Sequence, residues 1–360
     1  MSMTLVALLG VLCLFLLILL KMPISFAMFM VGFFGMLYMT SPIAAYNVIS
    51  SGIWEQLSGY SLSVIPLFIF MGELLFRSGI TEKIFAAAYA WIGHFRGSMA
   101  TTTILSSAGF AAVSGSNTAT AATVGTIALP EMKKFGYNRA LSAGSVAAGG
   151  TLGVIIPPSS VLIVIALQAE LAIRDLFLAS IVPGLILVVL FIATIGLLCR
   201  RRPDMGPAGV RSSWSVRWRS LKGIIEIGAL FTLVLGGLFA GWFTSTEAAA
   251  VGCIGAMLIT LIQGKLSWAV LSEAIANALK SSAMILMLVA GAVIFGRFLT
   301  ITRLPYMVGE WAAALPLPAM MVMACILLIY VIGGALMDAM GFLIISIPIF
   351  FPVALALGYD

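Results

Sequence analysis

The chain has 360 residues, of which 62% are hydrophobic and 9% charged, with a mean hydropathy of +1.17 and a formal net charge of +6. Soluble domains carry about 25% charged residues, so this composition excludes a soluble globular protein and predicts an all-α polytopic membrane protein. The four cysteines are scattered without a C-x-x-C pair, which argues against a metal or disulfide framework.

Apolar segments that are long enough, or nearly long enough, to span a bilayer follow one another along the chain. They occupy 4–20, 23–40, 61–77, 139–170, 175–198, 223–243, 244–263 and 281–301. Two further apolar stretches, 97–130 and 317–355, are interrupted midway by Ser114–Asn117 and by Gly333–Gly341. We interpret each as a re-entrant helical hairpin that enters and returns on the same side. Short amphipathic pieces are expected at 45–58, 81–95, 267–279 and 305–315.

The distribution of basic residues supports this threading. With the N-terminus outside, all of the 19 lysines and arginines except Arg174, Arg297 and Arg303 fall on one side. Basic residues concentrate in cytoplasmic loops, so the basic stretch 199–222 is predicted to be a cytoplasmic linker. Its charge then reflects topology rather than nucleic-acid binding. Binding of lipid headgroups by this linker stays open as an alternative.

The two hairpins enter from opposite sides in this threading, which predicts an inverted repeat. When Gly72 is aligned with Gly296, Ser114 falls opposite Asp338, tip against tip. The predicted organisation is a set of N-terminal transmembrane helices at 1–44, a first repeat at 45–198, the linker at 199–222 and a second repeat at 223–360. The second repeat lacks a counterpart of Gly149–Ser160, so we expect a C-terminally truncated chain.

The first hairpin tip carries candidate ligands for an ion and an anion. Gly115 permits a tight turn, and carbonyls together with the oxygens of Ser116, Asn117 and Thr120 suit a small cation. The amides at the start of the returning helix suit a carboxylate. The structural alternative is that Ser114 and its small or hydroxyl-bearing neighbours only allow close helix packing.

A broken helix is predicted where two prolines follow one another. Pro157 and Pro158 each lack an N–H, and Pro158 displaces Pro157 from the helical region. Two half-helices should therefore flank the pair. Candidate substrate- or ion-binding residues around the break are Gly150, Thr151, Gly153, Pro157, Pro158 and Ser159. An ordinary proline kink is the alternative.

Two acidic residues stand inside apolar sequence. Asp338, at the second tip, is a candidate sodium ligand together with Ser116 and Asn117, because carboxylates at membrane depth are commonly functional. A structural hydrogen-bonding role for Asp338 is the alternative. Glu247 is expected to cap a helix start together with Ser245 or Thr246.

A family resemblance rests on several motifs together. They are Ser114–Thr120, Leu129–Met132, Phe135–Tyr137, Gly149–Ser159 and Phe243–Ala250. These motifs resemble the large membrane subunit (M, DctM type) of tripartite ATP-independent periplasmic (TRAP) transporters. The resemblance implies an elevator-type permease of the ion-transporter superfamily in the bacterial inner membrane.

The same resemblance implies a function and partners. It implies uptake of an organic acid anion, such as a C4-dicarboxylate, sialic acid or a related sugar or keto acid, driven by a sodium gradient. It implies a small four-helix membrane subunit (Q type) and a periplasmic substrate-binding protein (P type) as partners, in contact with membrane lipid. No cofactor is implied beyond Na⁺ as the coupling ion.

A stand-alone symporter and an intramembrane enzyme are the alternative function classes. Asn117 makes the tip read Ser-Asn-Thr, which is similar to dicarboxylate/sodium symporters that need no binding protein. A requirement for a binding protein in uptake separates these two readings. An intramembrane enzyme is disfavoured, because the sequence has one histidine, no G-x-S-x-G motif and no metal-ligand spacing.

Overall fold

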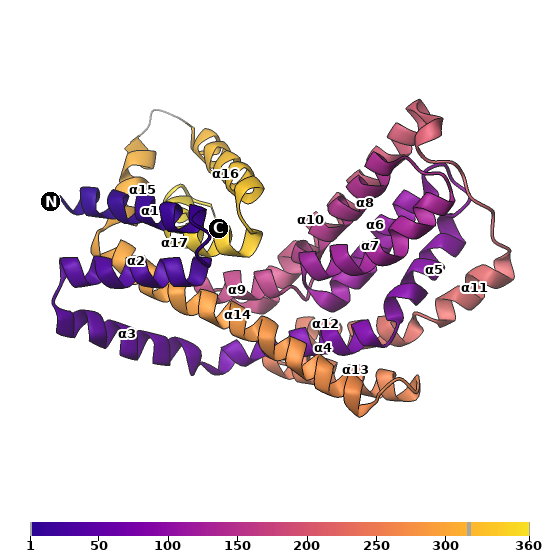
Figure 1. Ribbon diagram of the computed structural model, residues 1–360, viewed down its shortest axis with the longest axis horizontal. Helices are drawn as coiled ribbons and strands as arrows, with labels where there is room; N and C mark the ends of the chain where they lie inside the picture. The colour runs from indigo at the N-terminus through magenta and orange to yellow at the C-terminus, as the bar shows by residue number, and fades with distance from the viewer. Residues whose placement is uncertain (1, 315–317, 360) are drawn as a thin grey trace. The chain divides into compact units, whose positions relative to one another are not determined.

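The structure is a computed structural model that describes residues 2–314 and 318–359 (Figure 1). Within these residues the chain forms α-helices and short 3-10 turns, with no β-strand. The chain divides into two compact units that are described separately below. The first unit comprises Met1–Leu62, Val164–Leu171 and Ser282–Asp360, and the second comprises Ser63–Ile163 and Ala172–Ser281.

Several helices are long and apolar enough to cross a membrane. Five pass by length and composition among the described residues: Tyr60–Arg77, Ile173–Arg201, Ser245–Ile262, Trp268–Ile301 and Ala339–Ala356. Two bent pairs, Arg139–Ile155 with Ser160–Gln168 and Trp214–Lys222 with Ile225–Ala240, bring the number up to seven if each pair is counted as one span. The chain is therefore a multi-pass α-helical membrane protein, as its composition predicts.

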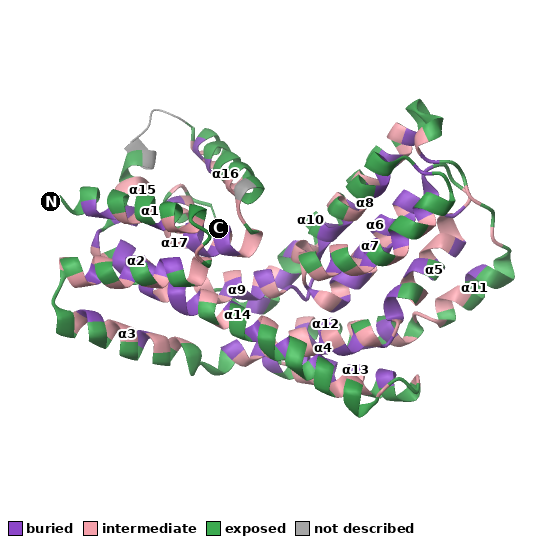
Figure 2. Ribbon diagram, in the orientation of Figure 1, coloured by how far each residue is buried: buried purple, intermediate pink, exposed green. Residues whose placement is uncertain are grey.

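The second unit contains the first predicted hairpin and the broken helix. Its helices are α4 (Val64–Arg77), α5 (Ile80–Ile92), α6 (Ser98–Ser114), α7 (Asn117–Lys134), α8 (Arg139–Ile155), the start of α9 (Ser160–Gln168), α10 (Ile173–Arg201), α11 (Trp214–Lys222), α12 (Ile225–Ala240), α13 (Ser245–Ile262) and the start of α14 (Trp268–Ile301). Helices α6, α7 and α8 pack against one another, and α5 and α10 lie against α6 (Figure 1). Their shared core includes Ile104, Phe110, Met132 and Leu152, all nearly inaccessible (Figure 2).

The basic segment 199–222 contains regular structure. It contains a short 3-10 turn, η2 (Pro203–Met205), and then α11, which packs on α5. Backbone amides of Gly97 and Asn138 donate to the carbonyls of Gly206 and Met205, at 2.9 and 3.0 Å. The Tyr137 hydroxyl donates to Pro207 O at 2.8 Å and accepts from Met99 N at 3.1 Å. These bonds attach the segment to the base of the α6–α7 hairpin.

Two details correct the sequence predictions. The amphipathic piece at 267–279 and the span at 281–301 are one continuous helix, α14, because Lys280-Ser281-Ser282 contains neither proline nor glycine to end it. Glu247 caps α13 as expected, but its partner is Thr244 rather than Ser245 or Thr246. Thr244 N donates to Glu247 Oε2 at 2.8 Å, and Glu247 N donates to Thr244 Oγ1 at 3.3 Å.

Glu73 belongs to a polar network in the second unit. The Arg77 guanidinium pairs with Glu273 and lies 3.8 Å from Glu73 Oε2. Asn277 Nδ2 donates to the same Glu73 oxygen at 3.3 Å. This network fixes the end of α4 against the first turns of α14.

The first unit contains the second predicted hairpin. Its helices are α1 (Met3–Leu19), α2 (Ile24–Met39), α3 (Pro42–Leu57), the end of α9, the end of α14, α15 (Leu304–Ala314), α16 (Ala319–Leu336) and α17 (Ala339–Ala356), with the 3-10 turn η1 (Tyr60–Ser63) beginning at its boundary. Gly10 makes room for the buried ring of Phe298, because a Cβ on Gly10 would lie 2.6 Å from Phe298 Cε1. In the hairpin, Tyr330 contacts the ring of Phe342, and Ser346 Oγ donates to the Tyr330 hydroxyl at 2.9 Å.

Candidate functional site

The tip of the first hairpin is a two-residue reversal between helices. Helix α6 ends at Ser114, and the next residue, Gly115, has a φ of +58°, in the left-handed region that glycine adopts without a Cβ clash. Ser116 is extended, and its Oγ accepts from Ala119 N at 3.4 Å, which caps α7. The predicted hairpin break at Ser114–Asn117 is therefore present at those residues.

The Pro-Pro break is also present where the sequence places it. Helix α8 ends at Ile155, α9 begins at Ser160, and the two are bent by 41°. The Pro157–Pro158 peptide bond is cis. A fully buried Ser159 accepts from Leu162 N at 3.4 Å through its Oγ, so it caps the second half-helix.

The fold brings the tip and the break into direct contact. Ser160 donates to the Gly115 carbonyl twice, through its backbone N at 3.2 Å and its Oγ at 3.0 Å. A Cβ on Gly115 would overlap Pro158 O and would lie 3.2 Å from Ser159 Cα. A Cβ on Gly153 would lie 2.6 Å from Ser116 C and 2.9 Å from Asn117 N. The hairpin tip thus packs backbone to backbone on both half-helices.

Close packing along α8 extends this contact. A Cβ on Gly150 would lie 2.8 Å from Ala121 Cβ and 3.3 Å from Asn117 O. Gly150 and Gly153 are both buried, one helical turn apart, on the side of α8 that faces α7. Gly150 and Gly153 therefore let α7 approach α8 closely next to the break.

Oxygen atoms cluster around the tip. Thr120 Oγ1 donates to Ser116 O at 2.6 Å and lies 3.0 Å from Ser114 Oγ. Ser116 Oγ lies 3.2 Å from Thr118 Oγ1, and Asn117 Oδ1 accepts from Thr118 N at 2.8 Å. These are neutral hydroxyl, amide and carbonyl oxygens, the donor type that hard cations such as sodium prefer.

Two of the predicted site residues, Thr151 and Thr120, use their hydroxyl groups in hydrogen bonds of the fold. Thr151 Oγ1 donates to Ala148 O of its own helix at 2.7 Å, and the residue is exposed. Thr120 is fully buried and already bonded within the tip. Ser160, which the sequence analysis did not single out, makes the bonds that join the break to the tip. Its position directly after Pro-Pro-Ser, as the first residue of the second half-helix, was the available signal.

Asp338 lies at the tip of the second hairpin, in the first unit. Helix α16 ends at Leu336, and Asp338 is the N-cap of α17. Its Oδ2 accepts from Met340 N at 3.1 Å and from Gly341 N at 3.3 Å. The structural hydrogen-bonding role is therefore present, and the side chain remains exposed.

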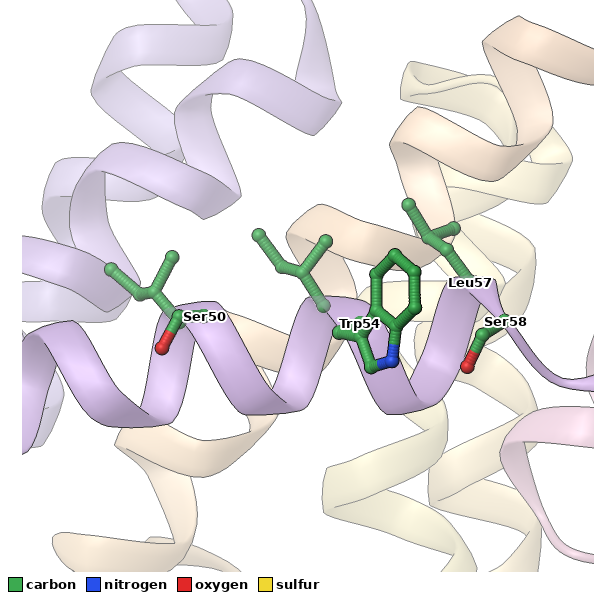
Figure 3. Close-up of a pocket in the computed structure, with 6 residues that line it drawn as sticks. Ser50, Trp54, Leu57 and Ser58 are labelled. Atoms are coloured by element: carbon green, nitrogen blue, oxygen red, sulfur yellow. The ribbon is translucent and has the colours of Figure 1, made fainter.

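Other features of the described residues do not form a competing site. No group of three or more His, Cys, Asp or Glu side chains is placed to hold a metal ion among them. A hollow of about 530 Å³ runs along α3 and is lined by Ile49, Ser50, Ile53, Trp54, Leu57 and Ser58 (Figure 3). Its lining is almost entirely apolar and includes none of the predicted site residues.

Taken together, the apolar helices, the hairpin and the broken helix define a multi-pass membrane protein with discontinuous helices. Comparison with known sequences then identifies its family. The profile described as "Tripartite ATP-independent periplasmic transporter, DctM component" matches residues 11–360. The chain belongs to this family, the large permease subunits of TRAP transporters.

Individual relatives agree with this assignment. The chain is 33% identical over 311 residues to the C4-dicarboxylate TRAP transporter large permease protein DctM of Pseudomonas aeruginosa, covering 86% of this chain and 72% of the relative. It is 27% identical to the sialic acid TRAP transporter large permease protein SiaM of Vibrio cholerae, covering 94% and 79%. The crystal structure of the YdaH transporter of Alcanivorax borkumensis shares the fold, with a TM-score of 0.58 at 15% identity over 88% of this chain and 74% of that one.

Proposed function

We propose that this chain is the permease component of a sodium-gradient-driven, binding-protein-dependent transporter that takes up an organic acid anion. Its partners are a small four-helix membrane subunit and a periplasmic substrate-binding protein, and it lies in the bacterial inner membrane. Membership of the large-permease family supports the transport activity. The relatives named for C4-dicarboxylate and for sialic acid both carry carboxylate substrates, which supports an anionic substrate.

The contact between hairpin tip and broken helix is the observation that carries the proposal. Helix α7 begins at Asn117 and α9 begins at Ser160, and both starts meet at Gly115. Helix N-termini carry partial positive charge, which favours a carboxylate. The tip oxygens of Ser116 and Asn117 are suited to sodium. Discontinuous helices with this arrangement recur at the substrate sites of secondary transporters.

An inverted repeat and an elevator movement complete the proposed mechanism. On the alignment of Gly72 with Gly296, Ile80 falls on Leu304, so the first residues of α5 and α15 coincide. The same alignment places the tip residue Ser114 on Asp338. These matches support the repeat. The two hairpins and the broken helices would form the transport domain, and the arms 45–58 and 267–279 would hold it.

The sodium role of the tips is tested by uptake into proteoliposomes that contain the permease with its small subunit and binding protein. Asn117→Ala is expected to raise the sodium concentration for half-maximal uptake roughly tenfold, which corresponds to about 1.4 kcal/mol of ion-binding free energy. Asp338→Ala should act in the same direction. Asp338→Asn is the sharper variant, because asparagine preserves the N-cap of α17 while removing the charge.

Thr126→Ala is the matched control for these variants. Thr126 lies on the same helix as Asn117, is exposed, and donates only to Thr123 O of its own helix, at 2.7 Å. It should leave sodium dependence at the wild-type value. Wild-type sodium dependence in both Asn117→Ala and Asp338→Asn would remove these residues from the ion site. Uptake without the binding protein would instead favour a stand-alone symporter.

A further inference from the structure

The surface helix α11 has the composition of a segment at a membrane–water boundary. Its nine residues, Trp214–Lys222, include Arg217, Arg219 and Lys222 and no acidic residue. It leads through a bend of 48° into the apolar helix α12. Trp214, Val216 and Trp218 are all at least half exposed. Exposed tryptophans beside basic residues are typical of the headgroup region, where the ring lies among lipids and the cation near phosphates.

One residue of α11 differs from the other basic residues. Arg217 is buried, with 6% of its surface exposed, and no acidic partner or hydrogen-bond acceptor among the described residues reaches its Nε or Nη2. The guanidinium carbon lies 5.0 Å from the centre of the Trp214 ring. That contact stabilises one face of the cation but supplies no acceptor to its N–H groups. Buried charges are normally paired, and the described residues supply no acceptor to these two N–H groups.

A second unpartnered donor lies on α5, in contact with the tryptophan rings of α11. The Trp91 Nε1 on α5 is also buried without an acceptor in the described part of the chain. The Trp91 ring makes edge contacts with the rings of Trp214 and Trp218, at centroid distances of 6.3 and 6.0 Å. These two residues flank Arg217 on α11. Helices α5 and α11 pack against each other (Figure 1). Each carries a buried N–H donor, the Trp91 indole on α5 and the Arg217 guanidinium on α11, without an acceptor among the described residues.

We propose that Arg217, with the indole N–H of Trp91, binds the phosphate of an anionic phospholipid headgroup. A guanidinium presents its N–H groups as a planar fork that matches two phosphate oxygens. The Trp214 ring that lies over the guanidinium is 62% exposed, so Arg217 is next to the protein surface that a lipid headgroup can reach. Lipid is favoured over free phosphate because the site lies beneath exposed apolar rings, which gain by contact with acyl chains. Arg219 and Lys222 add the positive potential that attracts anionic lipid.

The test uses the full chain purified in a neutral detergent and titrated with phosphatidylglycerol or phosphatidylcholine. Binding is followed by the lipid-induced rise in Tm. Phosphatidylglycerol is expected to stabilise the wild type, and phosphatidylcholine is not. Arg217→Met should weaken the apparent affinity for phosphatidylglycerol about 10-fold to 100-fold, the loss expected for a charge-assisted hydrogen-bonded pair. Without lipid, Arg217→Met should have a Tm equal to or above that of the wild type, because an unpaired buried charge is removed.

Arg219→Met is the matched control. It removes the same charge from an exposed position on the same helix, so it should keep most of the phosphatidylglycerol effect. Trp91→Phe, which keeps an aromatic ring without the N–H donor, should weaken binding in a folded protein even if Arg217→Met fails to fold. Equal loss in Arg219→Met and Arg217→Met would reduce the effect to general surface charge and overturn the proposal. Full stabilisation by inorganic phosphate at matched concentration would overturn the assignment to lipid.

Discussion

A single methyl group placed between the broken helix and the hairpin tip should separate them. In Gly153→Ala the new Cβ would overlap the Ser116 carbonyl oxygen and lie 2.6 Å from Ser116 C and 2.9 Å from Asn117 N. All three are backbone atoms, so no side chain can rotate away to make room. Gly153 is also buried, and its neighbours on α8 are packed against α7. The tip must therefore shift, or α8 must.

The magnitude follows from overpacking of a close-packed interior. Extra carbon atoms in such a site cost about 1–3 kcal/mol. For domains of 150–250 residues each kcal/mol corresponds to about 2–4 °C in Tm, so Gly153→Ala should lower the apparent Tm by several degrees. Gly144 is the matched control on the same helix. A Cβ there meets no described atom within 4 Å, so Gly144→Ala should gain about 0.5–1 kcal/mol from helix propensity.

Thermal unfolding of the purified variants in one detergent measures both effects. The measurement is repeated with sodium chloride and with choline chloride at equal ionic strength. If the tip binds sodium, the sodium-induced rise in Tm should shrink in Gly153→Ala and persist in Gly144→Ala. A Gly153→Ala protein as stable as Gly144→Ala would show that the tip and the break do not pack as described.

Two further predictions concern anchoring contacts. Tyr137→Phe should lower stability by about 1–3 kcal/mol, because Met99 N and Pro207 O lose their buried partner. Burial raises the pKa of Tyr137 above its usual 10.0, so the phenol stays neutral in the folded protein at pH values where it ionises in the unfolded chain. The stability of the wild type should therefore fall relative to that of Tyr137→Phe as the pH rises above 10. Below pH 10 the stabilities of the two proteins should change with pH in the same way. Thr244→Ala should lower the free energy of unfolding by about 0.5–2 kcal/mol, because it removes the cap of α13. Ser245→Ala changes a residue that does not cap and should have no such effect. Equal Tm values for the two variants would contradict the capping assignment.

Much of the architecture is determined locally and was therefore predictable. Pro157-Pro158 cannot continue a helix in any context, and the break between α8 and α9 lies there. Gly115 before an N-capping Ser116 ends one helix and starts the next, which fixes the first tip. Asp338 starts the second helix of the other hairpin, because its carboxylate accepts hydrogen bonds from the amides two and three residues ahead. Mean hydropathy alone predicts the membrane class.

Local sequence predicted less where no residue ends a helix and where several neighbouring residues could cap one. Amphipathic character changes near Lys280, but the backbone of α14 continues because nothing there breaks its hydrogen bonds. Thr244, Ser245 and Thr246 are chemically similar, and only the position of the first helical turn decides which one caps. The polar segment 199–222 gives no sign in its sequence that Tyr137 and the hairpin base will hold it.

The sequence by itself determined the class of protein, the family, both hairpin tips and the helix break, because these depend on hydropathy and on the backbone limits of proline and glycine. The tertiary structure decided which of these features meet. Ser160 bonds Gly115 across 45 residues, and Gly153 makes room for Ser116. It also decided that Arg217, unlike Arg219, is buried without a partner. Such contacts depend on how helices that are far apart in the sequence pack together, and a local pattern of residues does not determine that packing.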